Sequence, residues 1–298
     1  MSAISLSAGA GAGDSAPQAA AAERAQPRRH HWYRQPALIA GIVIIGLILL
    51  AVIAAPLLTS WNPDTQNLNA TLEGFSAHHW LGTDQEGRDT FARLLYGGRV
   101  DLQVAFIAVL FPFVLGTILG SLAGYFGGWI DLIIMRLVDI VVAFPFFVLI
   151  IALVFVLGPG ERSIYIAITL VGWVSYARII RGEILVAKRQ EYVLAAQSGG
   201  LSNLRIMGRH LLPNVITQAI IYAMSDIVQD ILAIVTLSYL GLGIQPPAAD
   251  WGTMISDGQN FLTTHWQLTT IPGLVVVVTG LGLSLIGDGL ADLLRPGQ

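Results

Sequence analysis

The chain alternates between long apolar runs and shorter polar segments. Runs of about 20 apolar residues are long enough to cross a bilayer as helices, and a backbone in lipid must satisfy its own hydrogen bonds. The pattern therefore predicts an all-α membrane protein with six transmembrane helices. The predicted spans cover about 37–58, 101–124, 132–157, 163–181, 215–240 and 267–287.

Composition supports a membrane protein and removes several classes of function. Of 298 residues, 54% are hydrophobic and 12% charged, and the mean hydropathy is +0.68. The net charge of −3 gives no reason to expect a nucleic-acid partner. The chain has no cysteine and lacks the Gly-Lys-Ser/Thr, His-Glu-x-x-His and Gly-x-Ser-x-Gly motifs. We therefore expect no catalytic residues, no metal site and no ATPase site in this chain.

The N-terminal segment differs from the rest of the chain. Residues 1–36 are rich in Ala, Gly, Ser and Pro and then basic, which predicts a disordered cytoplasmic arm before a transmembrane domain over 37–298. The pair Arg28-Arg29 before an apolar run also suggests a twin-arginine export signal. The tail interpretation is preferred, because the run is full spanning length and more spans follow.

Basic residues give an orientation, because Lys and Arg favour the cytoplasmic side. With the N-terminus inside, twelve of the sixteen basic residues are cytoplasmic, and both termini are cytoplasmic as well. The outer segments keep four arginines. These are Arg88, Arg93, Arg99 and Arg162.

The segment Glu191–Asn214 is a polar, Arg-bearing island on the predicted cytoplasmic side. Gly199-Gly200 predicts a bend between two short helices. Ser202 is placed to cap the second helix, which stops at Leu212-Pro213-Asn214 before the next span. A short helix with small side chains suits a groove on a partner. The alternative is an amphipathic helix lying on lipid headgroups.

Charged side chains inside spans are costly and usually functional or paired. Asp226 and Asp230 lie four residues apart, so they share one face of the fifth helix. Two interpretations stay open: the carboxylates attract a cation or an ammonium group in a translocation pathway, or they pair with a neighbouring helix. Arg136 and Asp139, near the inner end of the third span, are interpreted as structural or gating residues that pair locally, with snorkelling of Arg136 as an alternative.

The outer segment 59–100 carries Asp84 and Asp89, interpreted as helix-capping or turn-forming residues. Thr83 with Glu86 suggests a capping box for a short surface helix. Pro112, Pro145 and Pro272 predict kinks in their helices.

The island resembles the cytoplasmic loop of ABC-importer permeases, which has an Ala-Ala pair (Ala195-Ala196), a glycine four residues later (Gly200) and a Leu-Pro near its end. Further motifs, in the same order, are similar to the dipeptide/oligopeptide/nickel branch, and the layout is similar to the second permease subunit of dipeptide importers. These motifs are Trp80-Leu81-Gly82-Thr83-Asp84 with Gly87-Arg88-Asp89, Arg209–Asn214, Leu240–Gly243 with Gln245-Pro246-Pro247, Trp251-Gly252 and Gly287–Leu290.

The resemblance implies a type I ABC importer permease fold with a cytoplasmic coupling helix in region 191–213. Leu194 departs from the glutamate of many members, so docking depends on shape more than on charge. The implied partners are a homologous permease subunit, two ABC ATPase subunits that bind ATP and Mg²⁺, an extracytoplasmic solute-binding protein and membrane lipid, in a bacterial or archaeal inner membrane. The implied ATPase-coupling residues are Glu191, Tyr192, Ala195, Ala196, Gly200 and Leu201.

The predicted function is a non-enzymatic permease subunit that forms half of a translocation pathway for di- or oligopeptides. A nickel or glutathione permease of the same class is one alternative. A proton-coupled secondary transporter with Asp226 and Asp230 as a relay is another.

Overall fold

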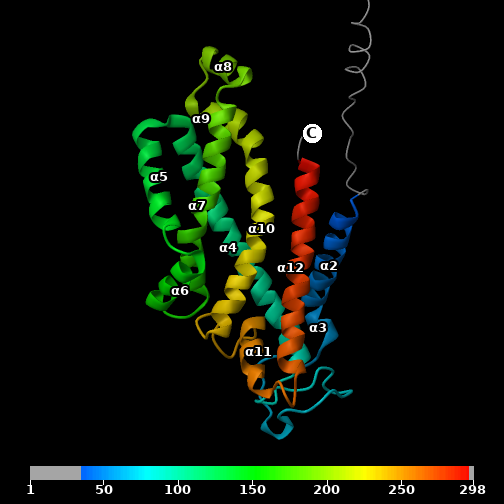
Figure 1. Ribbon diagram of the computed structural model, residues 1–298. Helices are drawn as coiled ribbons and strands as arrows, with labels where there is room; N and C mark the ends of the chain where they lie inside the picture. The colour runs from blue at the N-terminus through cyan, green and yellow to red at the C-terminus, as the bar shows by residue number, and fades with distance from the viewer. Residues whose placement is uncertain (1–34, 295–298) are drawn as a thin grey trace, which may run out of the picture.

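The computed structural model describes residues 35–294, in which the regular structure is helical and contains no β-strand (Figure 1). The predicted arm over 1–36 lies outside these residues except for its last two positions. The α-helices are α2 (Pro36–Ile53), α3 (Ala55–Leu58), α4 (Thr90–Phe126), α5 (Gly128–Val142), α6 (Phe146–Leu157), α7 (Glu161–Ala187), α8 (Glu191–Ser198), α9 (Asn203–Arg205), α10 (Leu212–Tyr239), α11 (Trp251–Gly258) and α12 (Gln267–Leu294).

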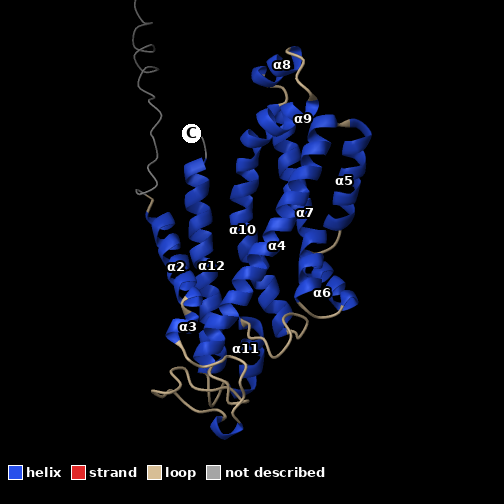
Figure 2. Ribbon diagram, turned by 180° about the vertical axis from the view of Figure 1, so that it is seen from behind, coloured by secondary structure: helices blue, strands red, loops and turns tan. Residues whose placement is uncertain are grey.

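The long helices form one elongated bundle, with α4, α7 and α10 between two flanking groups (Figures 1 and 2). Helices α2 and α12 run side by side on one flank, and α5 and α6 lie on the other. The short helix α8 projects from one end of the bundle, whereas α11 and the 59–89 segment cover the opposite end. The two ends of the bundle therefore carry different polar elements.

Five helices of the described chain are long and apolar enough to cross a membrane, and a sixth crossing is broken. Helices α5 and α6 meet at 90°, so the apolar run predicted to span over 132–157 is broken near Pro145, where a kink was predicted. Pro145 precedes α6, and a proline disfavours helical backbone at the residue before it. The proline therefore does more than kink this span.

Helix α4 begins at Thr90 rather than near 101. Asp89 caps it, since its carboxylate accepts a hydrogen bond from the Ala92 N–H at 2.6 Å. The capping interpretation of Asp89 is confirmed. Thr83 and Glu86 form no capping box, because the Thr83 hydroxyl instead accepts from the Glu73 N–H at 2.9 Å.

Small residues set the close packing of α4 on α7. A Cβ added to Gly116 would lie 2.3 Å from the Trp173 carbonyl oxygen, and one added to Gly120 would lie 2.5 Å from that of Ala177. Glycines at such contacts let membrane helices approach backbone to backbone. Gly116 and Gly120 are therefore packing residues of this helix pair.

Candidate functional site

The helix predicted at the start of the polar island is present as α8, Glu191–Ser198. Val193 on its inner face is fully buried, and it belongs to an apolar cluster with Tyr176 and Ile184 of α7 and Val215 of α10. This contact fixes α8 to two long helices of the bundle.

The six residues assigned to ATPase coupling do not share one surface. Ala196 and Leu201 are partly buried against the cluster that holds Val193. The other four, which are Glu191, Tyr192, Ala195 and Gly200, are exposed. The structure thus divides the predicted contact set into an anchoring group and an outward-facing group.

The glycine bend after α8 is confirmed. Gly200 adopts φ 74, a left-handed backbone conformation that glycine takes without the steric penalty of a Cβ. The Gly200 N–H donates to the Gln197 carbonyl at 3.0 Å, and the Leu201 N–H donates to that of Ala196 at 3.2 Å. These bonds close the C-terminus of α8.

The predicted stop at Pro213 is wrong. Residues Asn203–Tyr239 run as one helical span, through a π-helical turn at Ile206–Leu211 and into α10. Ser202 precedes α9, but its side chain makes no capping hydrogen bond. The wider π turn shifts the hydrogen-bond register just before Pro213, and the Asn214 side-chain amide donates to the His210 carbonyl at 2.7 Å. The proline is therefore accommodated without a break.

Asp226 and Asp230 both lie on α10 and are 5% and 1% exposed. The Tyr176 hydroxyl of α7 donates to Asp226 Oδ2 at 2.7 Å. Asp230 Oδ2 has no hydrogen-bond partner among the described residues, and no arginine or lysine of that part of the chain forms an ion pair with either carboxylate. The two carboxyls are thus both buried on α10 without a neutralising cation from the described residues.

Arg136 and Asp139 are exposed on α5, and the described residues show no ion pair between them. The ion pair on this helix is made by Asp131, which is bound through two hydrogen bonds, at 2.5 and 2.7 Å, by Arg181 of α7. The local pairing expected of Arg136 with Asp139 is therefore absent. Helix α5 is instead linked to α7 through Asp131, which lies one to two helical turns before these residues.

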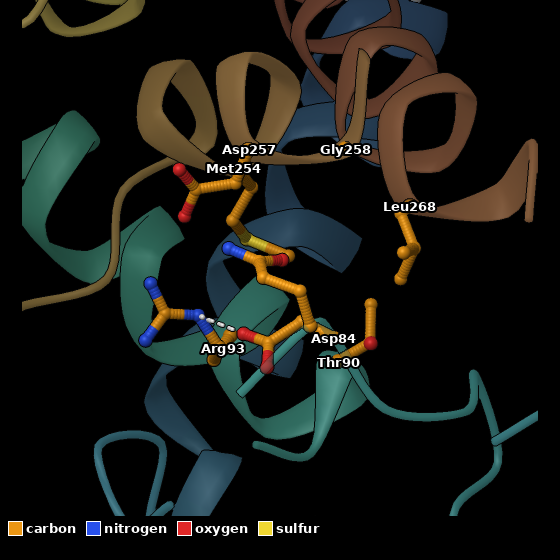
Figure 3. Close-up of a pocket in the computed structure, with 8 residues that line it drawn as sticks. Asp84, Thr90, Arg93, Met254, Asp257, Gly258 and Leu268 are labelled. Atoms are coloured by element: carbon orange, nitrogen blue, oxygen red, sulfur yellow. Dashed lines mark ion pairs between the residues drawn. The ribbon is translucent and has the colours of Figure 1, made fainter. Parts of the chain in front are cut away.

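An ionic cluster at the α11 end was missed by sequence reasoning. Arg88 is 3% exposed, and its Nε donates to Asp84 Oδ2 at 2.6 Å. Arg93 of α4 lies 3.6 Å from the same carboxylate (Figure 3), and Asp257 of α11 lies 3.4 Å from Arg88. The four-residue spacing of Asp84 and Arg88 was the available signal.

The cluster joins elements and holds no ligand-sized space. The enclosed volume beside Asp84 and Arg93 is about 10 Å³, room for a single water at most. Nearby, Asp250 caps α11 through the Thr253 N–H at 3.0 Å, and burial raises the pKa of the Asp250 carboxyl. At this end of the molecule the ionic cluster therefore holds the 59–89 segment, α4 and α11 together.

Comparison with known proteins assigns the family. Residues 116–298 match the family model described as the binding-protein-dependent transport system inner membrane component. The chain belongs to this family. Residues 29–74 also match the N-terminal transmembrane domain of oligopeptide transport permease C.

Two relatives and one solved structure extend this result to most of the chain. The dipeptide transport system permease protein DppC of Alkalihalophilus pseudofirmus is 42% identical over 87% of this chain and 85% of its own length. The glutathione transport system permease protein GsiD of Pectobacterium atrosepticum is 36% identical over 91% of each chain. The inward-facing MetNI methionine ABC transporter superposes with a TM-score of 0.53, over 68% of this chain and 97% of that one, at 17% identity.

The chain is therefore a permease subunit of an ABC importer, and the predicted permease fold is confirmed. As a member of this family it is not an enzyme, since ATP hydrolysis belongs to separate subunits. A proton-coupled secondary transporter is not the class to which the chain belongs.

Proposed function

We propose that this permease forms half of an inner-membrane pathway for di- or oligopeptides and that α8 transmits the movement of an ATPase subunit to it. The assignment of the cargo is based on the relatives, since the dipeptide permease of Alkalihalophilus pseudofirmus is similar over most of both chains. Glutathione, itself a short peptide, is the second candidate, favoured by the similarity to the Pectobacterium permease.

The observation that carries this proposal is that α8 has one face exposed to solvent and the other packed against the bundle. Its outward face presents Glu191, Tyr192 and Ala195 to solvent at the tip of the bundle, whereas Val193 is buried against α7 and α10. The exposed face of such a helix can dock in a groove of a partner. Its buried face then passes any displacement to the helices against which it packs. This arrangement favours docking over a helix lying on lipid headgroups.

The remaining partners are those that the family resemblance implies, and the distribution of basic residues gives the orientation in which they bind. The α8 end faces the cytoplasm, where two ATPase subunits bind ATP and Mg²⁺, and both chain termini lie on that side. A homologous permease supplies the other half of the pathway. An extracytoplasmic solute-binding protein delivers cargo at the α11 end. Asp226 and Asp230, near the middle of α10, face the pathway and attract the ammonium group of the cargo as it passes.

The experiment replaces Gly200 in the reconstituted importer. Gly200→Trp adds a bulky side chain on the outward face and forces a non-glycine residue to φ 74. We expect the complex to assemble, ATP hydrolysis to continue and peptide uptake to fall at least about tenfold. Uptake and ATP hydrolysis are measured in the same proteoliposomes.

Gly200→Asn is the matched control, because asparagine tolerates the left-handed conformation better than other side chains. It should retain most of the coupled uptake. If Gly200→Trp transports peptide at the unmodified rate, the docking role of this bend is wrong.

A further inference from the structure

A hollow of about 490 Å³ lies between the halves of α7 and α10 nearest to α8. Its size falls within the range of about 300–1,000 Å³ that is common for small-molecule sites. In the sequence, Arg178 was used only as one of the basic residues that indicate orientation, and Glu183 was assigned no role. Both residues line this hollow. The polar side chains in its wall are those of Arg178, Glu183, Gln218, Tyr222 and Ser225.

Arg178 carries a charge that the described part of the chain leaves unneutralised. It is exposed and makes no ion pair within residues 35–294, although it lies in a helix long and apolar enough to span the membrane. By contrast, Arg181 is held by Asp131 through two hydrogen bonds. Arginines in membrane helices usually face the bundle interior or a water-filled cavity and often mark a substrate pathway, and the fork of a guanidinium matches a carboxylate.

Glu183 lies in the same wall, five positions after Arg178. At 1.5 Å per residue the two positions are about 7.5 Å apart along the helix axis. Arg178 and Glu183 carry opposite charges on long side chains, so the wall offers one contact for a carboxylate and one for an ammonium group. This pair suits a small molecule that carries both groups.

The hollow also borders the buried acidic pair. The Tyr222 ring in its wall packs edge-to-face on Tyr176, with ring centroids 5.0 Å apart. Tyr176 in turn donates its hydroxyl to Asp226. One aromatic layer therefore separates the hollow from the carboxyls assigned to the pathway.

We propose that this hollow is a cargo subsite on the α8 side of the pathway, where Arg178 binds the C-terminal carboxylate of a short peptide and Glu183 binds its ammonium group. This inference rests on the proposed transport of peptides and deepens it by naming the two termini as the recognised groups. Arg178 and Glu183 are thus specificity-determining residues.

The test measures binding to the permease–ATPase complex in nanodiscs, without binding protein or nucleotide. A labelled dipeptide, Ala-Ala, competes with the same dipeptide carrying either a C-terminal amide or an N-acetyl group. The unmodified complex should prefer each free terminus at least about tenfold, as expected for one charge-assisted contact. Arg178→Gln should reduce the preference for the carboxylate to within about twofold and keep the preference for the ammonium group. Glu183→Gln should do the reverse.

Arg178→Lys restores a positive charge and should recover part of the carboxylate preference. Arg162→Gln is the matched control, because Arg162 is exposed at the opposite end of the same helix. The subsite is wrong if the unmodified complex binds no dipeptide or if Arg178→Gln keeps the full carboxylate preference. ATP-dependent uptake of the same dipeptide by the complete importer tests the proposed function separately, so either one can fail alone.

Discussion

Buried polar side chains in this permease fall into two groups at the scale of single residues. Arg88 and Asp84 satisfy each other, which accounts for their burial as a structural contact. Asp230 is equally buried, yet one of its carboxylate oxygens has no partner in the described chain. A buried charge without a partner is destabilising, so we expect the acidic pair of α10 to serve transport rather than stability.

Replacement of Asp226 and Asp230 by asparagine tests this explanation. The double variant keeps the side-chain shape and removes the negative charge, so uptake of a free-amine dipeptide should fall at least about tenfold, which corresponds to the loss of about 1.4 kcal/mol of attraction. The amount of assembled complex in the membrane should change less than twofold. Both quantities are measured in the same cells, by labelled uptake and by quantitative immunoblotting.

Tyr176→Phe is the control, because it removes the 2.7 Å hydrogen bond to Asp226 without changing its charge. Its uptake should stay close to that of the unmodified importer. Normal uptake by the double variant would make the carboxylates structural.

At the scale of helices, the sequence predicted which segments are helical better than it predicted where those helices bend or break. All six apolar runs contain helices, because hydrophobic length alone decides whether a segment can cross a bilayer. A kink at Pro145 was predicted, but neither its 90° angle nor the uninterrupted passage through Pro213 was predictable. A proline interrupts a helix or is absorbed by it according to the hydrogen-bond register and the packing around it, and the sequence does not contain either.

The same limit applied to the candidate site. Small and apolar residues predicted that α8 would form, but they did not show that Ala196 and Leu201 face inward while Ala195 faces outward. Arg178 was also out of reach, because its lack of an ion pair depends on where Asp131 lies relative to Arg181. The motifs identified α8 as an element of interest, but only its packing against the bundle showed which of its side chains are exposed to a partner.

The contact between α4 and α7 should be the most sensitive to added volume. Gly120→Ala places a Cβ 2.5 Å from the Ala177 carbonyl oxygen, so the helices must separate, and overpacking of this kind costs about 1–3 kcal/mol. The purified complex should lose several degrees of thermal stability. Gly46→Ala in α2 is the control, because the added Cβ meets no atom within 4 Å, and it should leave the unfolding temperature unchanged. Equal unfolding temperatures for the two variants would contradict the close packing described for α4 and α7.

For the molecule as a whole, the two ends of the bundle are specialised in different ways. The α11 end is closed by the ionic cluster around Arg88 and carries the exposed indoles of Trp61, Trp80 and Trp266, a residue type enriched at membrane–water interfaces. The α8 end carries a projecting helix (Figure 1) and most of the basic residues among those that the structure describes. This asymmetry supports the proposal that α8 lies at the cytoplasmic end, because Lys and Arg prefer that side.

The absence of cysteine from the chain allows a direct test of this orientation. Ser198→Cys places a single thiol on α8, and Thr263→Cys places one beside α11, both at exposed positions. In intact cells a membrane-impermeant maleimide should label Thr263→Cys and not Ser198→Cys, because only the α11 end faces outward. After the membrane is permeabilised, both variants should react to a similar extent, which controls for thiol accessibility. Labelling of Ser198→Cys in intact cells would reverse the orientation and remove α8 as the docking element of a cytoplasmic ATPase.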